Sequence, residues 1–492
     1  MTDTIETFPL LGRDPVDEAY IEDVAQTKRF LEHWSAFPDF RERLPHDTYG
    51  VTAEAGLKAD PEVIRPSWDA AFKGTEISPS VLRYRAFLRE KLQMRPQYRA
   101  STSHNEAFNA WRQRQINRTF GELGIAKADG IVHAGAAFEL CRGCSVGCWF
   151  CGIGAKKLVE VWPYSDENAA LWRGTLQALH DLIGQPAKQG FCYWATDPLD
   201  NPDYEKFICD FHDIMGRWPQ TTTAQPMRDP ERIRALLALS RSRGGQVERF
   251  SVLTKGTLRK VFETYTPSEL VRVELVLQME GNTTSKAFAG KARENTNRFE
   301  KEVAPPASLP GTGSTIACVS GFLVRMPEHL IELISPCPAN ERWPLGYRVH
   351  DRRTFASIEE LRSHISDMTS ETAMPRTVGA RATVRWRRDL RFSATDDGFV
   401  VENAALRHAF NNSTYPAMGE LGALLVEGMP AGDLALRLAD TTSTPLEETF
   451  HVLNRFYGGG LFDDEPALTQ RLEDDEVPAE PAPNRMEAAA HA

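Results

Sequence analysis

Three cysteines in one short segment have the spacing of ligands to an iron–sulfur cluster. Four of the chain's eight cysteines lie between residues 141 and 151, and Cys144, Cys148 and Cys151 follow the pattern C-x3-C-x2-C. One loop with this spacing can present three thiolates to a cubane cluster while the fourth iron has no protein ligand. An iron with an open position binds a substrate or cofactor, whereas a fully ligated cluster mainly transfers electrons. The spacing therefore predicts a cluster with a chemical role.

Other cysteine-based sites fit this segment less well. Structural zinc usually takes two short ligand pairs with a longer segment between them, and here only three residues separate the pairs. A bacterial ferredoxin run is spaced x2, x2, x3 and continues with proline, whereas this segment is spaced x2, x3, x2 and continues with Gly152. Cys141 is expected to end a strand as a small apolar residue, with a fourth-ligand role as the alternative. Zinc remains the rival metal.

The bulk composition is that of a globular protein with more than one domain. A chain of 492 residues is too long for one hydrophobic core, and its hydrophobic content of 41% and charged content of 25% are ordinary. The net charge of −11 disfavours a nucleic-acid surface. We find no apolar run long enough to span a bilayer, and the acidic first ten residues do not resemble a secretion signal. We therefore expect a cytoplasmic protein with no membrane or nucleic-acid partner, whose cysteines are reduced.

The order of the expected elements places the cysteines at the edge of a sheet. Residues 1–125 have helical patterns and no strand signals, and we expect a helical N-terminal domain. Residues 126–345 alternate strand and helix, which predicts a parallel sheet, open or curled into a partial (βα)6 barrel. The expected strands are 132–140, 190–195, 220–224, 249–254, 271–278 and 315–323. Ligands gather at the carboxyl ends of such strands, and the cysteine segment directly follows the first one.

The C-terminal third is expected to form a small, mostly helical domain over residues 346–470. Residues 384–391 are strand-like and basic, and helical patterns follow. Thr444 with Glu447 has the spacing of a capping box, and the glycines from Gly458 to Gly460 are expected to end the helix. Residues 471–492, rich in Ala, Pro and Glu, are expected to be a disordered tail.

The cysteine pattern resembles that of the radical S-adenosylmethionine (SAM) superfamily. Spacing, the aromatic Phe150 before the last cysteine and the position after a first strand all agree with this resemblance. It implies that Cys144, Cys148 and Cys151 hold a 4Fe–4S cluster and that S-adenosyl-L-methionine binds the open iron. By the same resemblance four residues belong to the cofactor site: Phe150, Thr196, Asp197 and Ser251. For Ser251 the alternative is an ordinary serine of the strand. The family's glycines are missing beside Thr196 and Asp197.

Cys337 is the remaining cysteine with a candidate chemical role. It lies between Pro336 and Pro338 after the apolar run 330–334, so we expect an extended corner at the end of a strand. We expect its thiol to face the same edge as the cluster, with a buried loop cysteine as the alternative. A thiol returns a hydrogen atom to a carbon radical, and return from the opposite face of a peptide α-carbon converts an L-residue into a D-residue. Cys192, Cys209 and Cys318 are most simply core residues.

The segments 139–152 and 333–338 together resemble the radical SAM amino-acid epimerases that mature ribosomally made peptides such as proteusins. This resemblance implies inversion of residues in a precursor peptide, Cys337 as hydrogen donor and an external electron donor. Crosslinking of a peptide by another radical SAM enzyme is the alternative activity, and a zinc-stabilised binding or regulatory protein is the alternative outside enzymes. The C-terminal region is similar to winged-helix modules that bind leader peptides. A plain helical cap and a DNA-binding module are its other interpretations, and nearby acids such as Glu448 and Asp463 argue against DNA.

Overall fold

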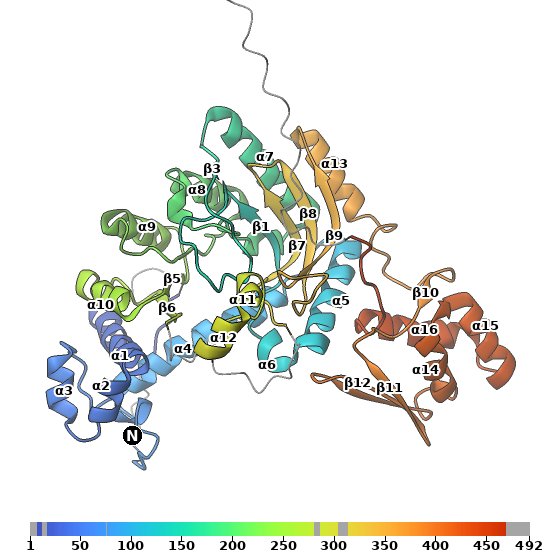
Figure 1. The fold of residues 1–492 in the computed structure, drawn as a ribbon, viewed down its shortest axis with the longest axis horizontal. Coiled ribbons are helices and arrows are strands. Elements are labelled where there is room, and N and C mark those ends of the chain that lie inside the picture. The colour runs from blue at the N-terminus through green and yellow to red at the C-terminus, as the bar shows by residue number, and fades with distance from the viewer. Residues whose placement is uncertain (1–6, 12–16, 75, 280–285, 304–312, 469–492) are drawn as a thin grey trace, which may run out of the picture.

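The computed structural model describes residues 7–11, 17–74, 76–279, 286–303 and 313–468, and it has a mixed α/β fold (Figure 1). No helix in these ranges is long and apolar enough to cross a membrane. The expected disordered tail at 471–492 lies outside the described residues. In the N-terminal part the expected helices are present, and the described residues before 130 contain no strand: α1 Glu18–Ala36, α2 Pro38–Arg43, α3 Thr48–Glu54, α4 Pro79–Arg99, α5 Glu106–Leu123 and α6 Ile125–Ala128.

Two separate sheets occupy the middle of the chain. The first has the order β1-β7-β8-β9, with β7 parallel to β1 and the other two neighbours antiparallel. The second is the parallel sheet β4-β5-β6. Their bounds are β1 Ala134–Glu139, β7 Val319–Arg325, β8 Leu330–Pro336, β9 Tyr347–Thr354, β4 Thr222–Thr223, β5 Glu248–Val252 and β6 Val273–Leu277.

The expected barrel of six consecutive strands is not formed as one sheet in the described residues. The second expected strand is reduced to a single parallel bridge between Ala137 and Phe191, and the third to Thr222–Thr223. The sixth expected strand, now β7, pairs with β1 and not with β6. In the described residues, β1 is parallel to β7, and β4, β5 and β6 are parallel to one another.

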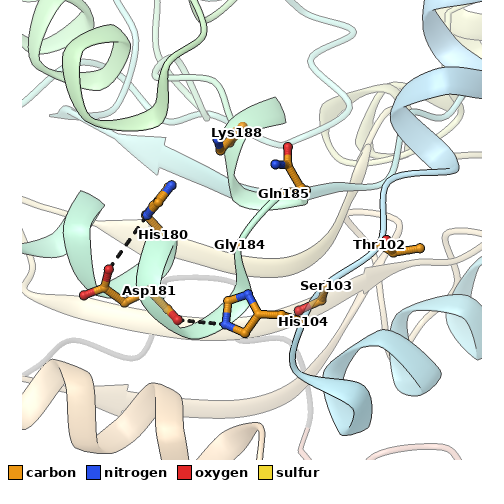
Figure 2. A pocket seen from close by; sticks show the side chains of 8 residues that line it. All are labelled: Thr102, Ser103, His104, His180, Asp181, Gly184, Gln185 and Lys188. Atoms are coloured by element: carbon orange, nitrogen blue, oxygen red, sulfur yellow. Dashed lines mark hydrogen bonds and ion pairs between the residues drawn. The ribbon is translucent and has the colours of Figure 1, made fainter.

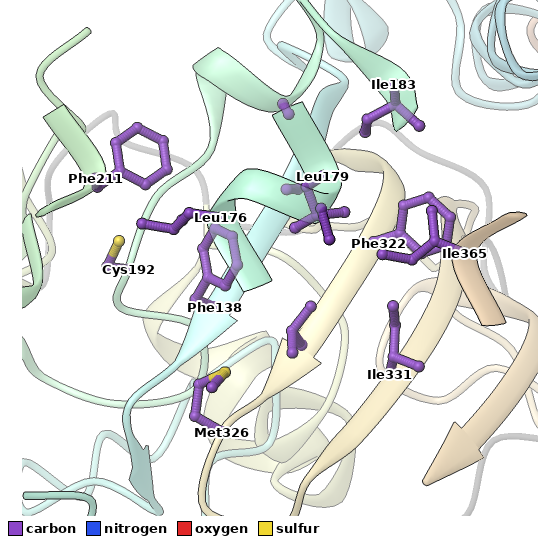
Figure 3. Packing of buried hydrophobic residues seen from close by; sticks show 14 of the residues in the cluster. Phe138, Leu176, Leu179, Ile183, Cys192, Phe211, Phe322, Met326, Ile331 and Ile365 are labelled. Atoms are coloured by element: carbon purple, nitrogen blue, oxygen red, sulfur yellow. The ribbon is translucent and has the colours of Figure 1, made fainter. Parts of the chain in front are cut away.

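Helices cover the outer face of the β1-β7-β8-β9 sheet. Figure 3 shows Phe138, Phe322 and Ile331 from three strands meeting side chains of α7, α8 and α13 in this core. The expected apolar stripe of α7 is confirmed, since Trp172, Leu176, Leu179 and Ile183 are all fully buried. The helices around the two sheets are α7 Asp166–Ile183, α8 Tyr204–Met215, α9 Pro230–Ser242, α10 Lys255–Thr264, α11 Lys291–Glu294, α12 Thr296–Glu302 and α13 Ile358–Met368.

The opposite face of the same sheet is its inner face. A second apolar cluster lies there, built from residues such as Ala137, Val319 and Leu323, with Phe191 and Trp194 packed against them. Tyr193 lies at the border of this cluster, and its hydroxyl reaches Thr222 of the β4-β5-β6 sheet at 3.0 Å. The inner faces of the two sheets therefore adjoin at Tyr193.

The C-terminal region contains more strand than expected. An antiparallel sheet of β11, β12 and β13 packs against three helices around Trp386 and Phe399. The basic stretch 384–391 is not one strand, because β10 ends at Val384 and β11 begins at Arg391. The elements are β10 Thr383–Val384, β11 Arg391–Thr395, β12 Gly398–Glu402, β13 Arg407–Asn411, α14 Met418–Glu427, β14 Met429–Pro430, α15 Ala431–Thr442 and α16 Leu446–Gly458.

The expected capping box at Thr444 is wrong. Helix α16 begins after Pro445, and no side chain caps its first turn. Thr444 is buried instead, and its hydroxyl is hydrogen-bonded to that of Thr442 at 2.6 Å. Because Pro445 holds the cap position, Thr444 lies one residue before the position from which a hydroxyl caps a helix. The glycines at the other end do stop the helix, which ends at Gly458.

Candidate functional site

The cysteine segment forms a loop that is closed at its base. Directly after β1, the short strand β2 (Cys141–Arg142) pairs with β3 (Glu160–Val161) in antiparallel orientation. The amide of Cys144 also donates to the carbonyl of Lys156 at 2.9 Å. The loop between these contacts therefore starts at the carboxyl end of β1, as the order of elements predicted.

One glycine of the loop is required by its conformation. Gly143 has a φ of 90°, in the left-handed region that favours glycine, and a Cβ there would lie 2.4 Å from the carbonyl oxygen of Lys157. Any other residue at 143 would separate the two sides of the loop base. Gly143 thus allows the two sides of the loop base to approach closely just before the first of the three cysteines.

The thiols of Cys144, Cys148 and Cys151 are half-buried and lie within electrostatic reach of one another. Burial raises the pKa of Cys148 to about 12, and the charges of Cys151 and Cys144 add to the shift. The pKa of Cys144 rises to about 11 for the same reason, with Asp197 contributing. Three thiolates held together in this way require positive charge between them.

The three thiols are a donor type that both a cubane cluster and a single zinc ion accept. No group of three His, Cys, Asp or Glu side chains in the described part of the chain is arranged to hold one metal ion. Zinc needs its ligands to converge on one point. A cubane takes each thiolate on a different iron, so its three sulfurs stand farther apart. Cys144, Cys148 and Cys151 are therefore the residues that would hold the cluster.

Cys141 differs from the other three cysteines. It is fully buried in β2, and its thiol lies within hydrogen-bonding reach of Thr196 and Asn201. Burial raises its pKa to about 12. The side chain thus contacts the turn after residues 191–194, which agrees with its expected role as a small residue at a strand end.

Asp200 is a site residue that the sequence analysis missed. Its carboxylate, whose side chain is fully buried, accepts hydrogen bonds from the Ser145 amide at 2.9 Å and the Ser145 hydroxyl at 2.5 Å. It also accepts from Gln225 Nε2 at 3.3 Å and is paired with Arg228 at 2.9 Å. Because Ser145 follows the first of the three cysteines, Asp200 anchors the loop to the ends of neighbouring strands.

Asp197 is held by protein donors. Its carboxylate accepts from the Thr223 hydroxyl at 2.9 Å, from the Ala224 amide at 2.7 Å and from the Leu199 amide at 3.1 Å. These bonds join the turn after 191–194 to the end of β4. Burial raises the pKa of Asp197 although these bonds oppose it. Its predicted contact with SAM remains a prediction, as does that of Thr196 beside it.

The turn before Asp197 has the backbone conformation that glycine prefers. Ala195 has a φ of 53°, which is uncommon for a residue with a Cβ. The sequence lacks the glycines expected in this turn, and Ala195 adopts the left-handed conformation instead. The turn therefore has the left-handed conformation without the glycine that usually allows it.

Phe150 and Ser251 occupy different surroundings. Phe150 lies in the loop, where the ammonium of Lys286 is 5.1 Å from its ring centroid and Trp149 packs edge-on. Ser251 is half-buried on β5, in register with Val276 of β6. Phe150 shares the loop with the cysteines, whereas Ser251 lies on the other sheet.

The expectation that Cys337 faces the same edge as the cysteine loop is wrong. Cys337 directly follows β8, as predicted, but β8 is antiparallel to β7, and β7 is parallel to β1. The end of β8 therefore lies at the amino end of β1, opposite the edge from which the loop departs. The thiol is fully buried in the apolar cluster of the inner face.

A buried ion-pair network adjoins Cys337. Arg348 of β9 donates to Glu122 of α5 at 2.8 Å and to Glu465 at 2.9 Å, and Arg118 donates to Glu122 at 2.8 Å. Burial raises the pKa of Cys337 to about 12, partly opposed by Arg348. Cys337 is therefore a protonated thiol at neutral pH.

Two cavities in the described residues are lined by residues outside the cysteine loop. Figure 2 shows one of about 650 Å³ between the segment before α5 and the end of α7, where His104 bonds the carbonyl of Asp181 at 2.8 Å. A second, of about 540 Å³, is lined by Glu90, Arg217 and Gln246 among others. Neither includes a residue that the sequence analysis predicted for the site.

Comparison with known proteins gives one relative of similar length. No protein-family model matches the chain. Over 461 residues it is 34% identical to a protein of Sinorhizobium fredii named "uncharacterized protein y4wI", and the alignment covers 90% of this chain and 88% of that protein. The crystal structure of BtrN in complex with AdoMet and 2-DOIA is similar at 15% identity over 40% of this chain and 72% of that chain, with a TM-score of 0.28. A TM-score this low does not establish a shared fold.

Proposed function

The chain belongs to the same family as protein y4wI of Sinorhizobium fredii, and we propose that it is a radical SAM enzyme that converts L- to D-amino acid residues in a ribosomally made precursor peptide. The observation that carries the proposal is the anchored loop at the carboxyl end of β1, whose three thiols have the spacing of cubane ligands. The resemblance of two segments to peptide epimerases supplies the finer activity.

Cys144, Cys148 and Cys151 would hold the 4Fe–4S cluster, and SAM would bind its open iron. When bound and reduced, this cofactor pair supplies the one-electron chemistry that removes a hydrogen atom from a peptide α-carbon. The chain's own contribution is to fix the loop, through the bonds from Asp200 to Ser145. Thr196, Asp197, Ser251 and Phe150 are proposed SAM contacts.

Cys337 is the proposed hydrogen donor. Its protonated thiol carries the hydrogen atom that an α-carbon radical needs. The S–H bond breaks as the new C–H bond forms, which leaves a sulfur radical. One electron and one proton from an external reductant restore the thiol.

The first experiment is anaerobic reconstitution with iron and sulfide. We expect a brown protein with about four irons per chain, the content of one 4Fe–4S cluster, and cleavage of SAM under a strong reductant. Peptides encoded by short reading frames beside the gene are then incubated in heavy water, where D-residues should carry deuterium at the α-carbon. Zinc in place of iron, or intact SAM, would refute the proposal.

Two cysteine variants test whether Cys337 is the hydrogen donor. Cys337→Ala should still cleave SAM but form no D-residues and take up no deuterium. Cys318→Ala is the matched control, because Cys318 borders the same apolar cluster and its pKa is likewise raised by burial, to about 11. Deuterated D-residues from the Cys337→Ala protein would exclude this cysteine as the donor.

A further inference from the structure

A row of polar side chains crosses the inner face of the β4-β5-β6 sheet. Thr222, Arg249 and Glu274 are in register on the three strands. Arg249 Nε donates to Glu274 Oε2 at 2.8 Å, and the ammonium of Lys91 on α4 lies 3.4 Å from Glu274 Oε1. The outer face of the same strands is apolar, with Phe250 and Val252 in a core with the N-terminal helices. The polar row is therefore confined to the side that adjoins the other sheet.

Tyr193 and Gln220 extend the row toward β1. Thr222 donates its hydroxyl to Tyr193 Oη at 3.0 Å, and Tyr193 donates to Gln220 Oε1 at 3.1 Å. Arg249 also reaches Gln220 Oε1, at 3.5 Å. These contacts join the five side chains into one network. Tyr193 borders the apolar cluster that contains Cys337, so the network continues the inner face of the first sheet.

The two halves of the inner face differ in access. On β7, Val319 and Leu323 are fully buried. The side chains of Arg249 and Glu274 are 31% and 28% exposed, so the polar half remains open. The polar half is therefore the more accessible part of the inner face.

The polar row contains both hydrogen-bond donors and hydrogen-bond acceptors. Arg249 carries five N–H donors, and its hydrogen bonds to Glu274 and Gln220 use two of them. Burial alone would raise the pKa of Glu274, but Arg249 and Lys91 outweigh it and lower the pKa to about 2. Glu274 is thus an ionised acceptor beside spare donors. An extended peptide presents C=O and N–H groups in alternation, and this mixture of partners matches it.

We propose that the row formed by Tyr193, Gln220, Thr222, Arg249 and Glu274 binds the main chain of the substrate peptide. This inference rests on the proposed function, because it assigns the surface on which that peptide is held. Arg249 donates to peptide carbonyls and Glu274 accepts from peptide amides. These residues bind the peptide, and the hydrogen-atom chemistry stays with the loop and Cys337.

The test measures peptide retention on immobilised, reconstituted protein with an mRNA-displayed library of random peptides. The double variant Arg249→Gln, Glu274→Gln keeps side-chain size and removes the ion pair. The matched control is Arg234→Gln, Glu269→Gln, whose pair on the outer side is also 2.8 Å long and about equally exposed, at 34% and 32%. We expect at least tenfold lower retention for the first variant, and retention equal to that of the unmodified protein for the control. Tyr193→Phe, a smaller change, should lower retention about threefold.

Three results would overturn the inference: equal retention by the row variants, no retention by the unmodified protein, or retention limited to peptides rich in Asp and Glu. The last would indicate an anion site around Lys91 and Arg249. Thermal unfolding establishes that each variant is folded. Iron and sulfide content are measured on the same samples without peptide, so failure of the proposed cofactor chemistry is seen separately from failure of peptide binding.

Discussion

Replacement of Asp200 tests how the cysteine loop is held. Asp200→Asn keeps the size of the side chain but turns one accepting oxygen into a donor, so the Ser145 amide or hydroxyl loses its partner. A hydrogen bond to a charged group contributes about 1.5–3 kcal/mol, and the charge that pairs with Arg228 is lost as well. We therefore expect the loop to open more easily by about 2 kcal/mol, which is about thirtyfold in the opening equilibrium.

Hydrogen exchange with mass spectrometry measures this opening directly. Amides of residues 143–149 should exchange about thirtyfold faster in Asp200→Asn, and the iron content after reconstitution should fall. Asp203→Asn is the matched control, because Asp203 accepts from the Tyr164 amide and from Lys206, outside the loop. Exchange in the loop that is equal in both variants would refute the idea that Asp200 anchors it.

Two further predictions concern stability. His350 is buried, and burial lowers its pKa from 6.5 to about 3, so the unfolded chain binds the proton first. This residue alone should lower the free energy of unfolding by about 1.6 kcal/mol between pH 6.5 and 5. His350→Gln should reduce the total loss by that amount in denaturant titrations at the two pH values, while His33 and His133, whose pKa values burial also lowers, still contribute. Ala195→Gly should leave stability equal or slightly higher, because relief of about 1–2 kcal/mol of left-handed strain exceeds the 0.4–1 kcal/mol that glycine costs through the unfolded chain. Ala170→Gly, at an exposed position within α7, should lower the melting temperature, and equal losses in the two glycine variants would contradict the strain argument.

The parts that follow from local patterns could be predicted from the sequence. The stripe from Trp172 to Ile183 has helical spacing, and α7 forms there because Ser165 caps its first turn and Gly184 ends it. The cysteine loop was placed after the first strand because a run of small apolar residues precedes it. Both predictions depend on residues within about twenty positions of one another.

The parts that depend on distant pairing could not be predicted. Asp200 contacts Ser145 across 55 positions, and nothing in either local sequence indicates the contact. The sheet of β11 to β13 was missed because its edge strands are mostly exposed and lack the alternation of a half-buried strand. The partner of β7 was also beyond reach, since an apolar strand fits beside either β1 or β6 by composition alone.

The direction of β8 has the largest consequence for the proposed chemistry. The apolar run 330–334 was recognised as a strand, but its sense depends on the tight connection after β7, which reverses the chain within residues 326–329. That reversal carries Cys337 to the edge opposite the cysteine loop. On the inner face, the polar row on β4, β5 and β6 is the more exposed surface. The strand order of this sheet therefore sets where Cys337 lies relative to both the cysteine loop and the polar row.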